Sequence, residues 1–246
     1  MRRVAIVPIL AVTVAYFSGC RSNPTPAPTA DEPPKVSPSS PSPGSSFTES
    51  PLESDSRPRI VCFGDSLTAG YGTEMGQSYP DFLQTDLDHQ GYQYRVVNAG
   101  ISGNTTKDGL ERVARIIAMK PAIVVVEFGG NDGLRGLRIE DTRANLDKIL
   151  STLTGSGTRV VLAGITLPPD YGQDYIQQFN QTYNLLAKKY HVPMLPFLLK
   201  GVFGVDGMMQ PDRTHATAAG NKVVAENVLG LIQPLIKKGP AGSSRP

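Results

Sequence analysis

The stretch AIVVVEFGGNDG, Ala122–Gly133, decides the fold that the sequence predicts. Its first part, Ala122–Phe128, is a nearly continuous apolar run, which suits a strand buried on both faces of a parallel sheet. Its second part, Gly129–Gly133, is a polar, glycine-rich loop. The two parts together predict a buried strand that ends in a loop of the kind that carries functional side chains.

Similar apolar runs lie on both sides of this stretch, and helical patterns separate them. Strands that alternate with helices predict an α/β protein, a three-layer α/β/α sandwich around a parallel sheet of about five strands. The predicted strands are Arg59–Phe63, Tyr94–Asn98, Ala122–Phe128, Arg159–Ile165 and Val192–Phe197. The predicted helices are Ser78–His89, Thr106–Met119, Glu140–Thr154, Asp174–Tyr190 and Ala216–Ile236.

Polar loops follow the predicted strands. GDSLTAG, with Ser66, follows the first strand, and NAGISGN, with Gly103, follows the second. GGNDG, with Asn131, follows the third, and the long loop after the fifth ends in PDRTH, which contains Asp212 and His215. Because the carboxyl ends of parallel strands meet at one edge of a sheet, these loops predict an active site there.

Ser66 is the candidate nucleophile, and a serine needs a base within hydrogen-bond reach. Of the three histidines in the chain, His89 and His191 are expected at the opposite edge of the sheet. His215 is therefore the candidate base. Asp212 lies three residues before His215 and is the candidate acid that orients the imidazole.

Three groups are candidates for an oxyanion hole: the N–H groups of Ser66 and Gly103 and the side-chain amide of Asn131. Each has a simpler alternative. Ser66 suits the N-cap of a helix, and Gly103 and Asn131 suit turns that need a positive φ. Asp65 is predicted to be structural, bonding local backbone N–H groups.

Four motifs resemble the blocks of the GDSL, or SGNH, hydrolase family: GDSL, the glycine in NAGISGNTT, GGND, and DxxH ending at His215. The segment from Leu167 to Leu199 is similar to the bacterial branch of multifunctional acyl-CoA thioesterases, lysophospholipases and arylesterases. The resemblance implies a flavodoxin-like fold, with Ser66 as nucleophile, His215 as base and Asp212 as triad acid. Gly103 and Asn131 would be the oxyanion donors. Ala216 departs from the proline that many members have after the histidine.

Five side chains in the loops after the third and fourth strands are candidates for an apolar acyl pocket, the alternative being ordinary loop packing. They are Leu134, Leu137, Leu167, Pro168 and Tyr171. No cofactor is implied, and no cluster has the spacing of metal ligands. Cys62 lies in an apolar run and is predicted to be a buried core residue.

The N-terminal region predicts export. A basic start precedes an apolar run, Val4–Phe17, of signal-peptide length. Phe17-Ser18-Gly19-Cys20 resembles a bacterial lipoprotein cleavage box, so residues 1–19 are predicted to be a signal peptide and Cys20 to carry lipid. The alternatives are an ordinary signal peptide or an uncleaved anchor. The protein is then expected in the bacterial cell envelope, as an outer-membrane lipoprotein with its domain in the periplasm or at the surface.

The segment 20–57 is rich in proline and serine and predicts a disordered tether. The folded hydrolase domain is predicted over 58–238, followed by a flexible tail, 239–246. Loss of residues 1–19 would leave 22 basic and 22 acidic residues. A chain so balanced has no basic field for nucleic acid. A monomer is expected.

The sequence thus predicts a serine esterase that hydrolyses carboxylic esters or thioesters through an acyl-enzyme on Ser66. Lysophospholipids and small aryl or alkyl esters are the expected substrates. One alternative is a deacetylase of envelope or external polysaccharide. Another is a lipoprotein that binds lipid or glycan without catalysis.

Overall fold

The computed structural model describes residues 55–238. Its core is a five-stranded parallel sheet in the order β2-β1-β3-β4-β5. The strands are β1 (Arg59–Gly64), β2 (Arg95–Asn98), β3 (Ile123–Glu127), β4 (Arg159–Ala163) and β5 (Met194–Leu195). The predicted α/β architecture with five parallel strands is confirmed. The predicted signal peptide, Cys20, most of the tether and the tail lie outside the described residues.

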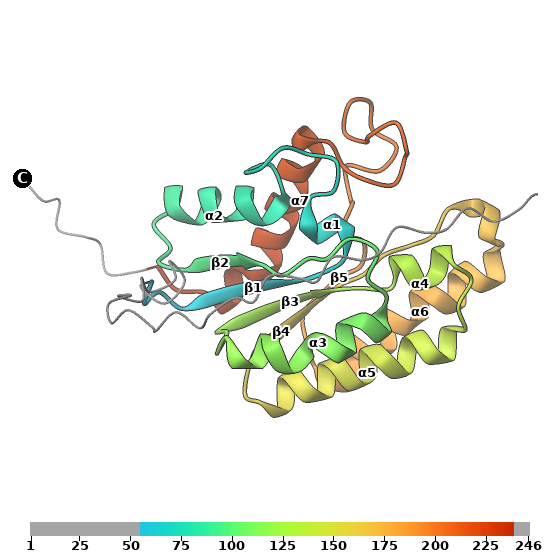
Figure 1. Cartoon of the computed structure of the whole chain (residues 1–246), viewed down its shortest axis with the longest axis horizontal. Helices are drawn as coiled ribbons and strands as arrows, with labels where there is room; N and C mark the ends of the chain where they lie inside the picture. Colours follow the sequence, from blue (N-terminus) through green and yellow to red (C-terminus); the bar gives the residue numbers. More distant parts are fainter. Residues whose placement is uncertain (1–54, 239–246) are drawn as a thin grey trace, which may run out of the picture. The chain divides into compact units, whose positions relative to one another are not determined.

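Helices cover both faces of the sheet. Figure 1 shows α2 and α7 packed together on one face and α3 and α5 on the other, with α6 beside α5. The helices are α1 (Ser66–Ala69), α2 (Tyr79–His89), α3 (Thr106–Ala118), α4 (Gly130–Leu134), α5 (Ile139–Gly155), α6 (Gln173–Tyr190) and α7 (Ala218–Ile232), with short 3₁₀ turns at Pro169–Tyr171 and Gln233–Leu235. Within residues 55–238, no helix has the length and apolar character needed to cross a membrane.

The central strands are buried on both faces, as their apolar sequences predict. All five residues of β3 are inaccessible to solvent, and so are Ile60 to Phe63 of β1. Cys62 is among them, and burial raises the pKa of its thiol to about 12. Its complete burial confirms the predicted core role. A buried thiol that stays protonated is also a poor nucleophile.

The edge strand β5 is shorter than predicted. The sequence predicts Val192–Phe197, but only Met194 and Leu195 pair with β4. Pro193 and Pro196 flank these two residues and have no backbone N–H to donate to the ladder, which limits the strand. The last helix, α7, also begins later than predicted, because Thr217 caps it by accepting from the Gly220 N–H.

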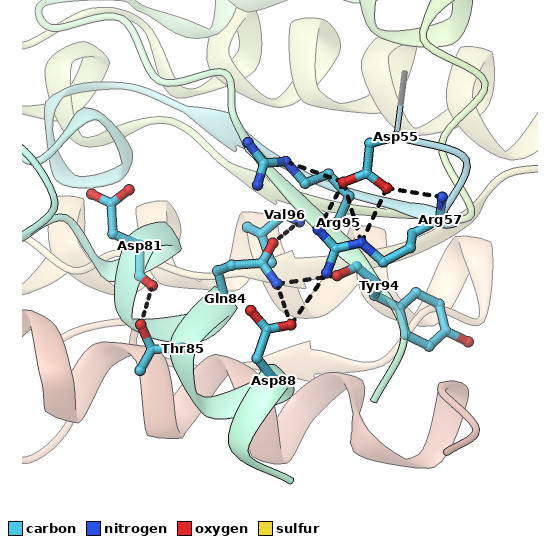
Figure 2. A network of polar contacts seen from close by, with 9 residues as sticks. All are labelled: Asp55, Arg57, Asp81, Gln84, Thr85, Asp88, Tyr94, Arg95 and Val96. Atoms are coloured by element: carbon cyan, nitrogen blue, oxygen red, sulfur yellow. Dashed lines mark hydrogen bonds and ion pairs between the residues drawn. The ribbon is translucent and has the colours of Figure 1, made fainter. Parts of the chain in front are cut away.

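The first described residues pack on the folded unit, although they belong to the predicted tether. Arg57 donates to the Asp55 carboxylate at 2.7 Å and to Asp88 of α2 at 3.2 Å (Figure 2). The hydrogen bonds from Arg57 lower the pKa of Asp55 to about 2. Nearby, the Gln84 side chain accepts from the Val96 N–H at 2.8 Å, which satisfies a donor on the edge strand β2.

Both ends of the described chain lie at the amino edge of the sheet. The Asp55 carboxylate lies 3.9 Å from the guanidinium of Arg95, the first residue of β2. Lys238 forms an isolated antiparallel bridge with Tyr92, shortly before β2. The loops that carry the predicted site follow the opposite, carboxyl edge. There the sheet order reverses between β1 and β3, which is the position where open α/β sheets bind ligands.

Candidate active site

Ser66 is the first residue of α1, two positions after Gly64, the last residue of β1. Asp65 occupies the N-cap position, and its Oδ1 accepts from the Leu67 N–H at 3.0 Å. The interpretation of Ser66 as an N-cap is therefore wrong, and the predicted structural role of Asp65 is confirmed. Gly70 ends this one-turn helix at a φ of +80°, which favours glycine. The short helix presents the Ser66 hydroxyl at the carboxyl edge of the sheet.

Ser66, His215 and Asp212 form a hydrogen-bonded chain. His215 Nε2 lies 2.9 Å from Ser66 Oγ, and His215 Nδ1 lies 2.7 Å from Asp212 Oδ2. An ionised carboxylate only accepts, so Nδ1 carries the hydrogen and Nε2 is free to accept from the serine hydroxyl. This is the tautomer that a general base next to a serine requires.

Asp212 is held as a carboxylate by its own loop. Its Oδ1 accepts from the backbone N–H groups of Thr214 at 2.9 Å and His215 at 3.0 Å. Partial burial raises the pKa of Asp212, but the bond to the His215 ring and the two backbone donors outweigh it and lower the pKa below its usual range. A charged Asp212 stabilises the imidazolium that forms when His215 takes a proton.

The three candidate oxyanion donors border one cavity with Ser66 Oγ. Gly103 has a φ of +81°, in the left-handed region that favours glycine. Asn131 is the second residue of α4, and its Nδ2 donates to Asp65 Oδ2 and to the Asn104 carbonyl, both at 3.0 Å. Both hydrogens of the Asn131 amide are thus engaged. Donation to an oxyanion would share or replace one of these two bonds.

The cavity has a volume of about 290 Å³. Of the predicted pocket residues, Leu134, Leu167 and Pro168 border it, whereas Leu137 and Tyr171 do not. Tyr171 instead supports a lining residue, because its hydroxyl donates to the Leu134 carbonyl at 2.8 Å. The lining comprises Asp65, Ser66, Leu67, Tyr71, Ser102, Gly103, Gly130, Asn131, Leu134, Ile165, Thr166, Leu167, Pro168, Phe197, Leu199, Phe203, Arg213, Thr214 and His215.

Comparison with known proteins agrees with this geometry. Residues 62–223 match the profile of the GDSL-like Lipase/Acylhydrolase family. The chain belongs to this family. Among the residues that the structure describes, no three His, Cys, Asp or Glu side chains form a group that could hold a metal ion in this GDSL-like hydrolase.

Several relatives of this GDSL-like hydrolase are named as esterases. It is 42% identical to esterase TesA of Pseudomonas aeruginosa over 72% of this chain and 89% of the relative. It is 36% identical to an arylesterase of Vibrio mimicus (73% and 88%) and 35% identical to thioesterase 1/protease 1/lysophospholipase L1 of Escherichia coli (72% and 84%). The protein is accordingly an ester hydrolase.

Solved structures show the same fold. The crystal structure of TesA matches with a TM-score of 0.70 at 42% identity, over 72% of this chain and 99% of the other. The SGNH-hydrolase family esterase AlinE4 matches with a TM-score of 0.62 at 38% identity, over 73% of this chain and 94% of the other.

Some residues of the site of this GDSL-like hydrolase carry no signal in the sequence. Gln210 is one: its Nε2 donates to the carbonyls of Tyr71 at 2.7 Å and Ala216 at 2.8 Å. Its backbone N–H also donates to the His215 carbonyl at 2.8 Å. Gln210 therefore fastens the histidine loop to the loop after α1. The Tyr71 ring lies 4.6 Å from the His215 ring, centroid to centroid, and is tilted 43° against it.

Asn131→Ala is expected to lower kcat for p-nitrophenyl esters by about 10²- to 10³-fold, with a much smaller change in KM. The reason is that the amide would bind the transition-state oxyanion and not the ground-state carbonyl. Steady-state kinetics measure the effect, and thermal unfolding checks the fold. Asn184→Ala, on the exposed face of α6, is the control. A folded Asn131→Ala protein with wild-type kcat would remove Asn131 from the oxyanion hole.

Proposed function

We propose that the protein hydrolyses carboxylic esters or thioesters of apolar acyl groups through an acyl-enzyme on Ser66. The observation that carries this proposal is the 2.9 Å contact between His215 Nε2 and Ser66 Oγ at the edge of a mostly apolar cavity. A serine paired with a neutral imidazole acceptor is an activated nucleophile. The apolar walls suit the acyl part of the substrate.

The proposed reaction has two halves. In the first, Ser66 Oγ attacks the acyl carbonyl while His215 Nε2 takes the hydroxyl proton and Asp212 stabilises the imidazolium. The N–H groups of Ser66 and Gly103 and the Asn131 amide receive the oxyanion. His215 then protonates the leaving alcohol or thiol. In the second half, His215 activates a water molecule, which releases the acid and restores Ser66.

The cavity favours acyl chains longer than acetyl. Leu134, Leu167, Leu199 and Phe203 border it, and each methylene buried against such walls contributes about 0.8 kcal/mol. We propose lysophospholipids and aryl or alkyl esters as substrates, in keeping with the arylesterase and lysophospholipase names of two relatives. The predicted lipid anchor at Cys20 would hold the domain at a bacterial envelope, where such lipids occur and acyl-CoA does not.

A ladder of p-nitrophenyl esters from acetyl to dodecanoyl tests the acyl preference. We expect kcat/KM to rise by up to about fourfold per added methylene until the cavity is full. Leu134→Trp, which narrows the cavity, is expected to lower kcat/KM for octanoyl relative to acetyl esters by about tenfold.

Leu137→Trp is the matched control, because Leu137 and Leu134 are similarly exposed, at 41% and 39%, but only Leu134 borders the cavity. Equal effects of the two variants would show that the acyl chain does not bind in this cavity. A wild-type ladder that peaks at acetyl would instead favour the deacetylase alternative.

A further inference from the structure

A second carboxyl group lies buried beneath the Ser66 turn. Glu127 ends β3 and is inaccessible to solvent, and its backbone is paired in register with Gly64 of β1. A Cβ atom at residue 64 would collide with Glu127 Oε2 and with Thr68 Oγ1. The absence of a side chain on Gly64 therefore lets the carboxyl group lie against the strand that leads to the nucleophile.

The two oxygens of Glu127 have different surroundings. Oε2 accepts from the Asp65 N–H at 3.2 Å and from the Thr68 hydroxyl at 2.8 Å. Oε1 is equally buried and has no hydrogen-bond partner among residues 55–238. An ionised carboxylate would place charge on an oxygen with no donor, which is costly away from water. A proton on Oε1 removes that charge and leaves both bonds to Oε2 intact.

Asp65, whose backbone N–H donates to Glu127, is only 2% exposed. Its Oδ1 accepts from the Leu67 N–H and its Oδ2 from the Asn131 amide, so each of its oxygens has a donor. Burial raises the pKa of Asp65 to about 6, although the hydrogen bonds from Leu67 and Asn131 act to lower it. Asp65 is therefore the member of the pair that carries the negative charge at neutral pH.

Among the described residues, none of the other titratable groups around Glu127 forms an ion pair with it. Burial raises the pKa of Tyr79 on α2 and of Tyr183 on α6 well above the usual range, so both phenols stay neutral. The Arg112 guanidinium of α3 donates to the carbonyls of Gly64 and Ala99. Burial and the Asp65 charge together raise the pKa of Glu127 well above its usual range.

We propose that Glu127 is a positioning residue that keeps its proton at neutral pH and so maintains Asp65 as the single carboxylate beneath Ser66 and Asn131. A second charge at Glu127 would repel Asp65, which caps α1 and bonds the Asn131 amide. The nucleophile and one oxyanion donor would then lose their common support. The effect on turnover rests on the proposed function, whereas the buried proton does not.

Stability against pH tests the buried proton directly. Glu127 holds its proton in the folded protein but ionises in the unfolded chain above the ordinary pKa of 4.5. The folded state therefore loses stability as pH rises from that value toward the raised pKa. In urea unfolding of the full-length protein from pH 6 upward, we expect Glu127→Gln to gain about tenfold in the folded-to-unfolded ratio per pH unit relative to wild type, for as long as the pH stays below the raised pKa of Glu127.

Glu111→Gln, at an exposed position on α3, is the matched control and should follow the wild-type profile. Parallel profiles for wild type and Glu127→Gln would overturn the proposal. Infrared spectroscopy of the wild-type protein at pH 7.5 gives a second readout that needs no variant. We expect the carbonyl band of a protonated carboxyl group, and its absence would also overturn the proposal.

Kinetics test the positioning role. Glu127→Ala is expected to lower kcat by roughly 10- to 100-fold with KM changed much less, since a small displacement of reacting groups costs about that much. Glu127→Gln, which keeps the shape and neutrality of the protonated acid, is expected to restore most of this loss. A Gln variant as impaired as the Ala variant, although folded, would contradict the role assigned to the neutral carboxyl group. Loss of all ester turnover in wild type would instead remove the proposed function and leave the stability result standing.

Discussion

Ser66→Ala is expected to fold normally and to retain less than about one ten-thousandth of the wild-type turnover of p-nitrophenyl esters. Without Oγ no acyl-enzyme forms, and the oxyanion donors and His215 can assist only direct attack by water. Removal of the nucleophile from other serine triads costs a factor of this size. The fold should tolerate the change, because the N-cap of α1 is Asp65 and not Ser66.

A fluorophosphonate probe with intact-mass readout identifies the nucleophile independently of turnover. Wild type should gain one adduct, and Ser66→Ala should gain none. Ser151→Ala, on α5, is the control and should label like wild type. An adduct that persists in Ser66→Ala would show that another residue is the nucleophile. A folded wild-type protein with neither adduct nor turnover would favour the non-catalytic binding alternative.

The second large effect is expected at His215. His215→Ala should lower kcat/KM by about 10⁴-fold or more, because the Ser66 hydroxyl then has no base at 2.9 Å. Asp212→Asn should reduce turnover less, because Asp212 acts through the imidazole and is partly exposed, at 41% of its side chain. Steady-state kinetics with a p-nitrophenyl ester measure both.

His89→Ala, at the end of α2, is the control for histidine loss and should keep wild-type turnover. A His215→Ala protein with more than about a tenth of wild-type activity would be incompatible with a general base at this position. A larger loss in Asp212→Asn than in His215→Ala would indicate that Asp212 has a role beyond orienting the ring.

Much of the fold follows from sequence, for a physical reason. The runs IVVVE and RVVLA are mostly apolar because helices cover both faces of β3 and β4. Their burial could therefore be predicted from the sequence. The helices α1 and α4 could not be predicted, since one turn is too short to show a period. The length of β5 was predicted wrongly, because the apolar pattern outweighed the two prolines that interrupt the hydrogen bonds to β4.

The site divides in the same way. Ser66, Asn131 and His215 were predictable because each lies in a short polar motif after a strand, and the structure brings all three to one cavity. Gln210 was not, because its bonds join residues that the sequence separates by more than a hundred positions. Glu127 was hidden inside an apolar run, where a single acid looks like an interruption. Its role depends on contacts with a different strand.

The positions of residues 55 and 238, where the described part of the chain begins and ends, have a practical consequence. Residues 55 and 238 leave the folded unit at the amino edge of the sheet, and the catalytic cavity opens at the carboxyl edge. A resin, fusion partner or display scaffold joined directly at residue 55 or 238 would therefore face away from the substrate entrance. Immobilisation through residue 55 or 238 would therefore leave the cavity accessible, and esters presented on a facing surface would still reach Ser66.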